Sequence, residues 1–258
     1  MDVTTAGSAI HAAGVAELLW RDANGPPAAV GVVPLVLGDR PAVALPWAQV
    51  DVARAAAASD TAALVLSDPR LTGSAWRPMV ATGRPTLVED GDGSLFTERL
   101  LDQELRKHPP SRALADSHML RRENWWYLPR LILLLDDVRV AAGGRRDSPL
   151  DAVLGVEDEG LHVRTVRVTD WAASPLELHG GPAVGGPAVL VGQEISVPDV
   201  EQWTVHTTAG RYADGSFSVT RPAPTRALEA RPGVLARVRR QRALERACIG
   251  GLRAAGHA

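Results

Sequence analysis

The apolar segments of this chain are short, and turn residues interrupt them at close intervals. Residues 16–21, 28–37 and 41–47 have the aliphatic and β-branched composition of strands, and a Gly-Asp-Arg turn separates the last two. The longest uninterrupted apolar run, Leu131–Leu135, is far shorter than the roughly 20 residues that a membrane helix needs. This pattern favours a β-rich globular protein and no contact with a membrane.

Further elements follow from the same reasoning. Additional strands are predicted at residues 61–67, 74–81, 83–89 and 130–140, with a later hairpin formed by residues 203–211 and 216–220. Helices are predicted at residues 50–59, 97–107, 111–123 and 232–255, of which the first is rich in alanine, the best helix former. Thr97 is the predicted cap of the second of these helices.

Charge and cysteine content exclude several classes of protein. A net charge of −2 argues against a general nucleic-acid binder, which needs a concentrated positive excess. The single cysteine, Cys248, forms no intrachain disulfide and fits a reducing compartment. No basic segment followed by an apolar run opens the chain, so we expect a cytoplasmic protein. The seven histidines show no metal-ligand spacing, and no metal site is predicted.

The order of these elements resembles the pyridoxamine 5′-phosphate oxidase-like, FMN-binding split-barrel superfamily. The likeness is carried by Gly38-Asp39-Arg40-Pro41-Ala42-Val43-Ala44-Leu45-Pro46-Trp47, by Ala53-Arg54, by Thr61-Ala62-Ala63-Leu64-Val65-Leu66-Ser67-Asp68, by Trp76-Arg77 and by Thr82-Gly83-Arg84-Pro85. It covers about half of the chain and depends on the order of the segments, since no single motif in it is diagnostic. The resemblance implies a mainly β (α+β) fold: a split β-barrel of antiparallel strands with short flanking helices and a C-terminal helix.

In domain terms, the resemblance implies a split-barrel FMN-binding-like domain at residues 1–142. A β-rich C-terminal extension ending in a helix would occupy residues 143–258, or would form part of the same domain.

The resemblance also implies a cofactor site. Members of this superfamily bind FMN at a homodimer interface and hold its phosphate with arginine or lysine side chains and with serine or threonine hydroxyls. By position, Arg54 and Arg77 are the candidate phosphate ligands, since a guanidinium offers a planar fork of donors that matches phosphate oxygens. Ser67 is the candidate hydroxyl, and Trp47 and Gln49 would lie at the isoalloxazine edge.

The resemblance therefore predicts an FMN-dependent oxidoreductase that acts as a homodimer on an unidentified small molecule. No side chain stands out as a catalytic acid or base, and a deazaflavin in place of FMN is an alternative cofactor. Because Asp51 and a run of alanines surround Arg54, a second interpretation is a non-catalytic binding protein that has lost flavin. A third is a haem-binding relative, with His118 as the candidate iron ligand.

Two segments remain outside this site. Residues 124–130, Asn-Trp-Trp-Tyr-Leu-Pro-Arg, gather three of the few aromatic residues, and we interpret them as a core plug or an interface in preference to a ligand wall. The final helix combines an apolar stripe with many arginines. We expect it to dock on the barrel and to leave its charged face in solvent.

Overall fold

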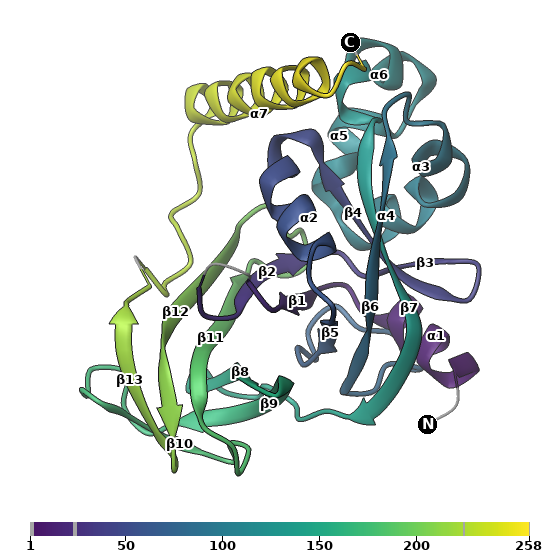
Figure 1. Ribbon diagram of the computed structural model, residues 1–258. Helices are drawn as coiled ribbons and strands as arrows, with labels where there is room; N and C mark the ends of the chain where they lie inside the picture. Colours follow the sequence, from purple (N-terminus) through teal and green to yellow (C-terminus); the bar gives the residue numbers. More distant parts are fainter. Residues whose placement is uncertain (1–2, 23–24, 224, 258) are drawn as a thin grey trace.

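Two antiparallel sheets form the framework of the computed structural model, which describes residues 3–22, 25–223 and 225–257 (Figure 1). The first sheet has seven strands in the order β2 (Ala28–Val32), β1 (Ala16–Trp20), β5 (Ala62–Leu66), β6 (Met79–Asp90), β7 (Arg130–Ala142), β4 (Arg40–Pro46) and β3 (Leu35–Leu37). The second closes into a six-stranded barrel in the order β10 (Leu176–His179), β13 (Ser216–Arg221), β12 (Trp203–Ala213), β11 (Gly186–Ile195), β8 (Asp151–Asp158) and β9 (Gly160–Val168).

The predicted fold class is confirmed: the described chain is mainly antiparallel β, with short helices and a C-terminal helix. The closed ring, however, lies in residues 151–221, where we expected a β-rich extension. The strands of residues 16–142, where we expected the barrel, form an open sheet.

The first sheet packs against the barrel through its edge strand β2. This strand approaches β11 and β12 so closely that a Cβ at Gly31 would lie 2.5 Å from Cγ2 of Val205 and 3.1 Å from the ring of Trp203. Because a Cβ projects from the face of a sheet, the contact is one of face packing, and the glycine permits it.

Short helices accompany the first sheet. They are α1 (Val3–Ala12), η1 (Trp47–Gln49), α2 (Val50–Ala57), α3 (Ser94–Arg99), α4 (Leu101–Lys107), η2 (Pro109–Ser111), α5 (Arg112–Ala115), α6 (His118–Glu123) and η3 (Trp125–Tyr127). The helix predicted from Thr97 begins earlier than expected, because the Asp90 carboxylate accepts hydrogen bonds from the backbone N–H groups of Leu95 and Phe96.

One predicted hairpin is a single strand. Residues 74–81 and 83–89 were expected to pair around Gly83, whereas β6 runs continuously from Met79 to Asp90 and pairs with β7. Gly83 marks a register shift, and a Cβ there would come within 2.5 Å of the Asp136 carbonyl oxygen. The glycine therefore permits a bulge and a close backbone approach in place of a turn.

A buried polar network, which we call the junction, joins the two sheets. Arg146, in the connection between β7 and β8, lies 3.0 Å from the Glu17 carboxylate and 3.1 Å from that of Asp68. Its Nε donates to Ser67 Oγ (2.9 Å), and the Ser67 hydroxyl and the Gln193 amide donate to Glu17. Burial raises the pKa of Glu17, and the Arg146 guanidinium opposes that rise. The guanidinium therefore compensates carboxylates that have lost contact with water.

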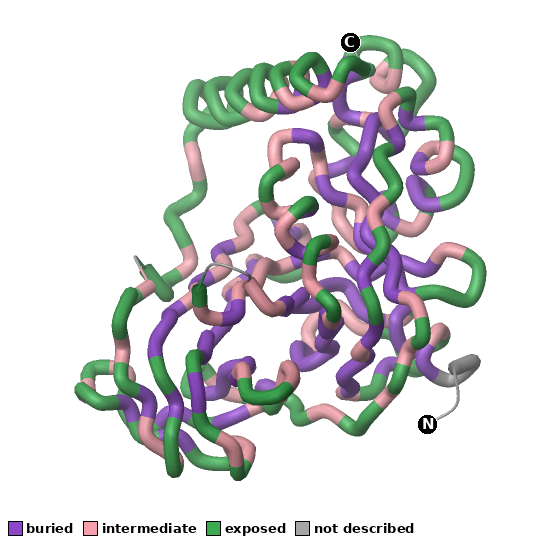
Figure 2. The backbone as a smooth tube through the Cα atoms, in the orientation of Figure 1, coloured by how far each residue is buried: buried purple, intermediate pink, exposed green. Residues whose placement is uncertain are grey.

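The C-terminal helix α7 (Val234–Ala254) docks only through its last turns. Cys248 and Leu252 are buried, whereas the preceding turns are exposed along most of their length (Figure 2). The docked end lies against η1 and η3, so the helix packs on the region of residues 1–142, where the split barrel was expected. Within the described residues, no helix combines the length and the apolarity needed to cross a bilayer.

Two adjacent glycines of α7 allow a test of this docking. A Cβ at Gly251 would lie 2.5 Å from the carbonyl oxygen of Trp47, whereas a Cβ at Gly250 meets nothing within 4 Å. We expect Gly251→Ala to lower the free energy of unfolding by about 1–3 kcal/mol through overpacking. Gly250→Ala should raise it by about 0.5–1 kcal/mol, because alanine favours the helix. Urea denaturation of both variants measures the difference, and equal effects at the two positions would contradict this docking.

Candidate functional site

Of the predicted cofactor residues, Gln49 and Arg54 lie five residues apart, at the end of η1 and within α2. The Arg54 side chain is about half exposed, and its guanidinium donates two hydrogen bonds to Glu89 Oε1, at 2.9 and 3.2 Å. Gln49 is half-buried at the end of η1. The charge of Arg54 is therefore already compensated within the chain.

The other three predicted residues have different surroundings. Arg77 is exposed and donates to the backbone carbonyls of Ser74 and Trp76. Trp47 is fully buried, and its ring lies 5.2 Å from that of His257, beneath the end of α7. Ser67 is buried in the junction. The five predicted residues thus have different surroundings. Arg54 and Arg77 are at the surface, Gln49 is half-buried, Trp47 is in the core and Ser67 is in the junction.

A pocket of about 440 Å³ lies elsewhere, where the helical layer meets the barrel. Its walls come from η2 and α5, from the connection between β11 and β12, from α7, and from residues 225–233, which we call the strap. The apolar and aromatic part of the lining is Pro110, Ala113, Leu114, Val200, Trp203, Ala230 and Leu244, and the polar part is His108, Glu201, Gln202, Thr204, Glu229, Arg240 and Gln241. None of the five predicted residues belongs to it.

His108 links this pocket to a buried hydrogen-bond network. Its Nδ1 lies 2.8 Å from Ser111 Oγ, which lies 2.8 Å from Glu104 Oε1 and 2.7 Å from the Tyr127 hydroxyl. The Tyr127 hydroxyl also donates to Glu104 Oε1, at 2.6 Å. Glu104, Ser111 and Tyr127 are all buried, so the network is shielded from solvent on the side away from the pocket.

Donor counting favours one tautomer of His108. A serine or tyrosine hydroxyl has one proton, and the Ser111 and Tyr127 hydroxyls both lie within hydrogen-bond distance of the Glu104 carboxylate. When both protons are directed to that carboxylate, Ser111 Oγ accepts from the His108 Nδ1–H, and the lone pair of the neutral ring is on Nε2. Nε2 has no hydrogen-bond partner among the described residues.

Charge and burial both favour the neutral ring. Burial lowers the pKa of His108, and this effect exceeds the raising influence of Glu104. Glu104 is itself paired with the buried Arg130 at 3.4 Å, and that guanidinium lies over the rings of Phe96 and Tyr127. Burial and the Glu104 charge together raise the pKa of Tyr127 far above its ordinary value, so its hydroxyl keeps its proton. The imidazole of His108, which lines the pocket, is thus uncharged at neutral pH.

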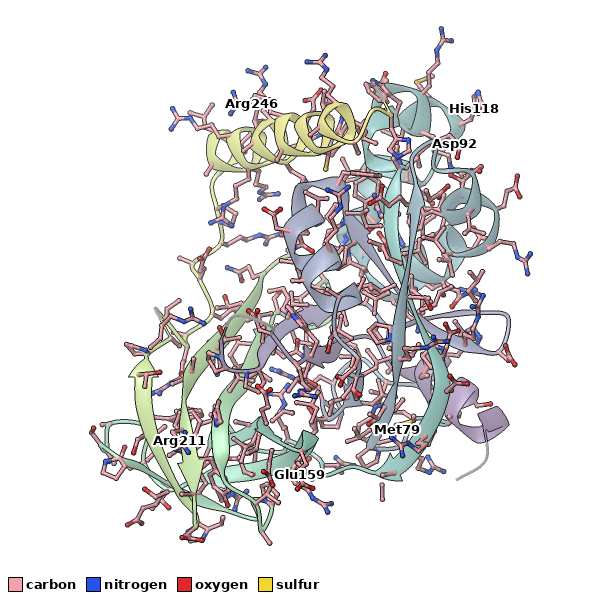
Figure 3. The ribbon with its side chains drawn as sticks, in the orientation of Figure 1. Met79, Asp92, His118, Glu159, Arg211 and Arg246 are labelled. Atoms are coloured by element: carbon pink, nitrogen blue, oxygen red, sulfur yellow. The ribbon has the colours of Figure 1, made fainter. Side chains whose placement is uncertain are left out.

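Sequence reasoning singled out a different histidine. His118 is exposed on α6 and projects from the periphery of the molecule (Figure 3). The local sequence gives no helical signal for His108, because the helix ends at Lys107 and Pro109 and Pro110 separate His108 from Ser111.

Comparison with known proteins gives a limited result. No family model matches the sequence, and no curated protein matches it. One similar solved structure is a pyridoxamine 5′-phosphate oxidase-related, FMN binding protein from Nostoc punctiforme, with 14% identity, a TM-score of 0.31, and coverage of 75% of this chain and 85% of that one. Another is a heme binding protein from Mycobacterium smegmatis, with 11% identity, a TM-score of 0.36, and coverage of 100% and 99%. The strand pairing described above defines the fold independently of both.

Proposed function

We propose that this protein binds haem in the pocket between the helical layer and the barrel, and that Nε2 of His108 would hold the iron. The observation that carries this proposal is the imidazole itself: it lines the pocket, burial favours its neutral form, and its Nδ1 lies 2.8 Å from Ser111 Oγ, whereas its Nε2 has no hydrogen-bond partner among the described residues. Histidines that ligate metals almost always donate their other ring N–H to a fixed acceptor, which sets the tautomer and the ring orientation.

The rest of the pocket is chemically suited to a porphyrin. Trp203, Leu114 and Leu244 supply apolar surface for the macrocycle. Arg240 lines the same pocket but is paired with Glu229 at 2.8 Å, so a haem propionate would compete with that carboxylate for the guanidinium. When bound, haem would supply an iron centre for electron transfer or for binding a diatomic ligand. The chain's own contribution is to hold and orient the imidazole.

Absorption spectroscopy of the purified protein titrated with haemin tests the proposal. The wild type should give a Soret band near about 410 nm. His108→Ala should weaken haem binding by about 100-fold, and Ser111→Ala by about tenfold, because the serine only orients the ring. His118→Ala is the matched control, since that imidazole is exposed, and it should bind haem as the wild type does. Unchanged haem binding by His108→Ala would refute the assignment of His108 as the residue that holds the iron.

A flavin-dependent oxidoreductase is the second candidate. It is supported by Arg77, whose guanidinium contacts only carbonyl oxygens and has no carboxylate partner among the described residues. Such a cation remains available for a phosphate. Flavin bands near about 370 and 450 nm in the purified protein would favour this candidate over haem. The homodimer that would complete such a site remains a prediction, and light scattering of the purified protein checks it.

A further inference from the structure

A second pocket, of about 600 Å³, lies at one opening of the six-stranded barrel. Leu176 of β10 and Val219 of β13 form an apolar floor that is continuous with the barrel core, and Thr208 of β12 adds a hydroxyl. Trp171, from the connection between β9 and β10, and Arg226, from the strap, stand at its rim. This pocket is separate from the one that contains His108, and the two share no lining residue.

Arg226 is held in place but has no counter-charge. Its guanidinium lies 4.3 Å from the centre of the Trp171 ring, and the indole N–H of Trp171 is fixed by a hydrogen bond to the Pro149 carbonyl at 3.1 Å. No carboxylate lies within ion-pair distance of Arg226 in the described part of the chain. Arg226 is an exposed residue at the rim, and the contact with Trp171 covers a face of its guanidinium, so the N–H edge of the guanidinium remains open to a bound anion.

The neighbouring His206 has a buried ring nitrogen whose hydrogen-bonding capacity is not satisfied. His206 is buried, its ring packs edge-on against Trp171 with centroids 6.1 Å apart, and its Nδ1 has no hydrogen-bond partner. Burial, together with the charges of Arg226 and Arg146, lowers the pKa of His206 to about 4. The histidine is therefore neutral at physiological pH, so Arg226 is the charged group that lines this pocket.

We propose that the barrel opening binds a small carboxylic acid, with the carboxylate on Arg226 and the apolar part on Leu176 and Val219. A guanidinium that is stacked on a ring keeps its N–H edge free for the two oxygens of a carboxylate. A single cation above an apolar floor fits a monoanion with a hydrocarbon body better than it fits a phosphate dianion.

Calorimetric titration with octanoate and with benzoate tests this proposal on the full-length protein. We expect binding of at least one of the two acids with a Kd in the range of about 1 mM or tighter, and no binding of octanol at the same concentration. Arg226→Gln should weaken binding by about tenfold or more, because a charge-assisted pair is lost.

Arg221→Gln is the matched control, because Arg221 is an exposed arginine at the end of β13 that does not line the pocket. It should change the affinity by less than about twofold. Thermal unfolding of both variants verifies that they are folded. The proposal is overturned if neither acid binds the wild type, or if Arg226→Gln binds the acids as tightly as Arg221→Gln does. Because haem binding depends on His108, the two proposals fail or succeed separately.

Discussion

Replacing Arg146 by methionine should lower the free energy of unfolding by about 3–5 kcal/mol. Methionine fills a similar volume but leaves the buried Glu17 carboxylate without its cation, whereas Asp68 keeps its ion pair with Arg70 at 2.7 Å. Arg145 is the matched control, because it is the adjacent residue and pairs with Asp147 at the exposed surface. Arg145→Met should cost less than about 1 kcal/mol. Urea denaturation measures both, and similar losses in the two variants would show that Arg146 does not compensate the junction.

The deficit of Arg146→Met should also depend on pH. Burial raises the folded-state pKa of Glu17, and removing the guanidinium that opposes this effect raises it further. A carboxyl with a raised folded pKa contributes stability that is present below its unfolded pKa, about 4.3, and that is lost as pH rises through the folded value. The difference in the free energy of unfolding between variant and wild type should thus be largest near neutral pH. It should become smaller as the pH falls and Glu17 takes up a proton. The double variant Glu17→Gln/Arg146→Met should recover part of the loss at neutral pH.

The second large effect is expected at Trp126. Its side chain is 2% exposed in the main core and packs at right angles to the Tyr127 ring, whereas the adjacent Trp125 is 48% exposed. Trp126→Ala should lower the free energy of unfolding by about 3–5 kcal/mol, through lost burial and the cavity that remains. Trp125→Ala should change it by no more than about 0.5 kcal/mol.

The urea concentrations at the midpoint of unfolding give both changes in the free energy of unfolding, provided that the dependence of this free energy on urea concentration has the same slope in variant and wild type. A loss below about 1 kcal/mol for Trp126→Ala would contradict its role in the core. The two tryptophans also correspond to the two alternatives, core plug and interface, that the sequence analysis gave for this segment. Trp126 and Tyr127 form the expected core plug, and Trp125 is left available for an interface.

Local composition predicted the elements that depend on neighbouring residues. The alanines of α2, the apolar run of β5 and the leucines of β7 appear where they were expected, because helix propensity and the burial of a continuous apolar strand act within one segment. The tight turn at Asp214 and Gly215 joins β12 to β13 as predicted, and both residues have positive φ.

Features that depend on distant pairing were not predictable. Whether the strands close into a ring is decided by which edge meets which neighbour, and Gly31 meets residues far along the chain, in β12. Ser67 was expected at a phosphate, but its position at the end of a buried strand brings it to Arg146, 79 residues away. Arg226 and Trp171 likewise meet only because the barrel brings its β9–β10 connection beneath the strap.

The junction also limits how far the two halves can act as independent modules. Glu17 lies in β1, yet the arginine that pairs with it lies beyond the last strand of the first sheet, and Gln193 of the barrel also donates to its carboxylate. A chain that ended at residue 142 would lack both of these partners of Glu17, although Asp68 would keep its ion pair with Arg70. The charge balance at Glu17 therefore ties the first sheet to the residues that follow it.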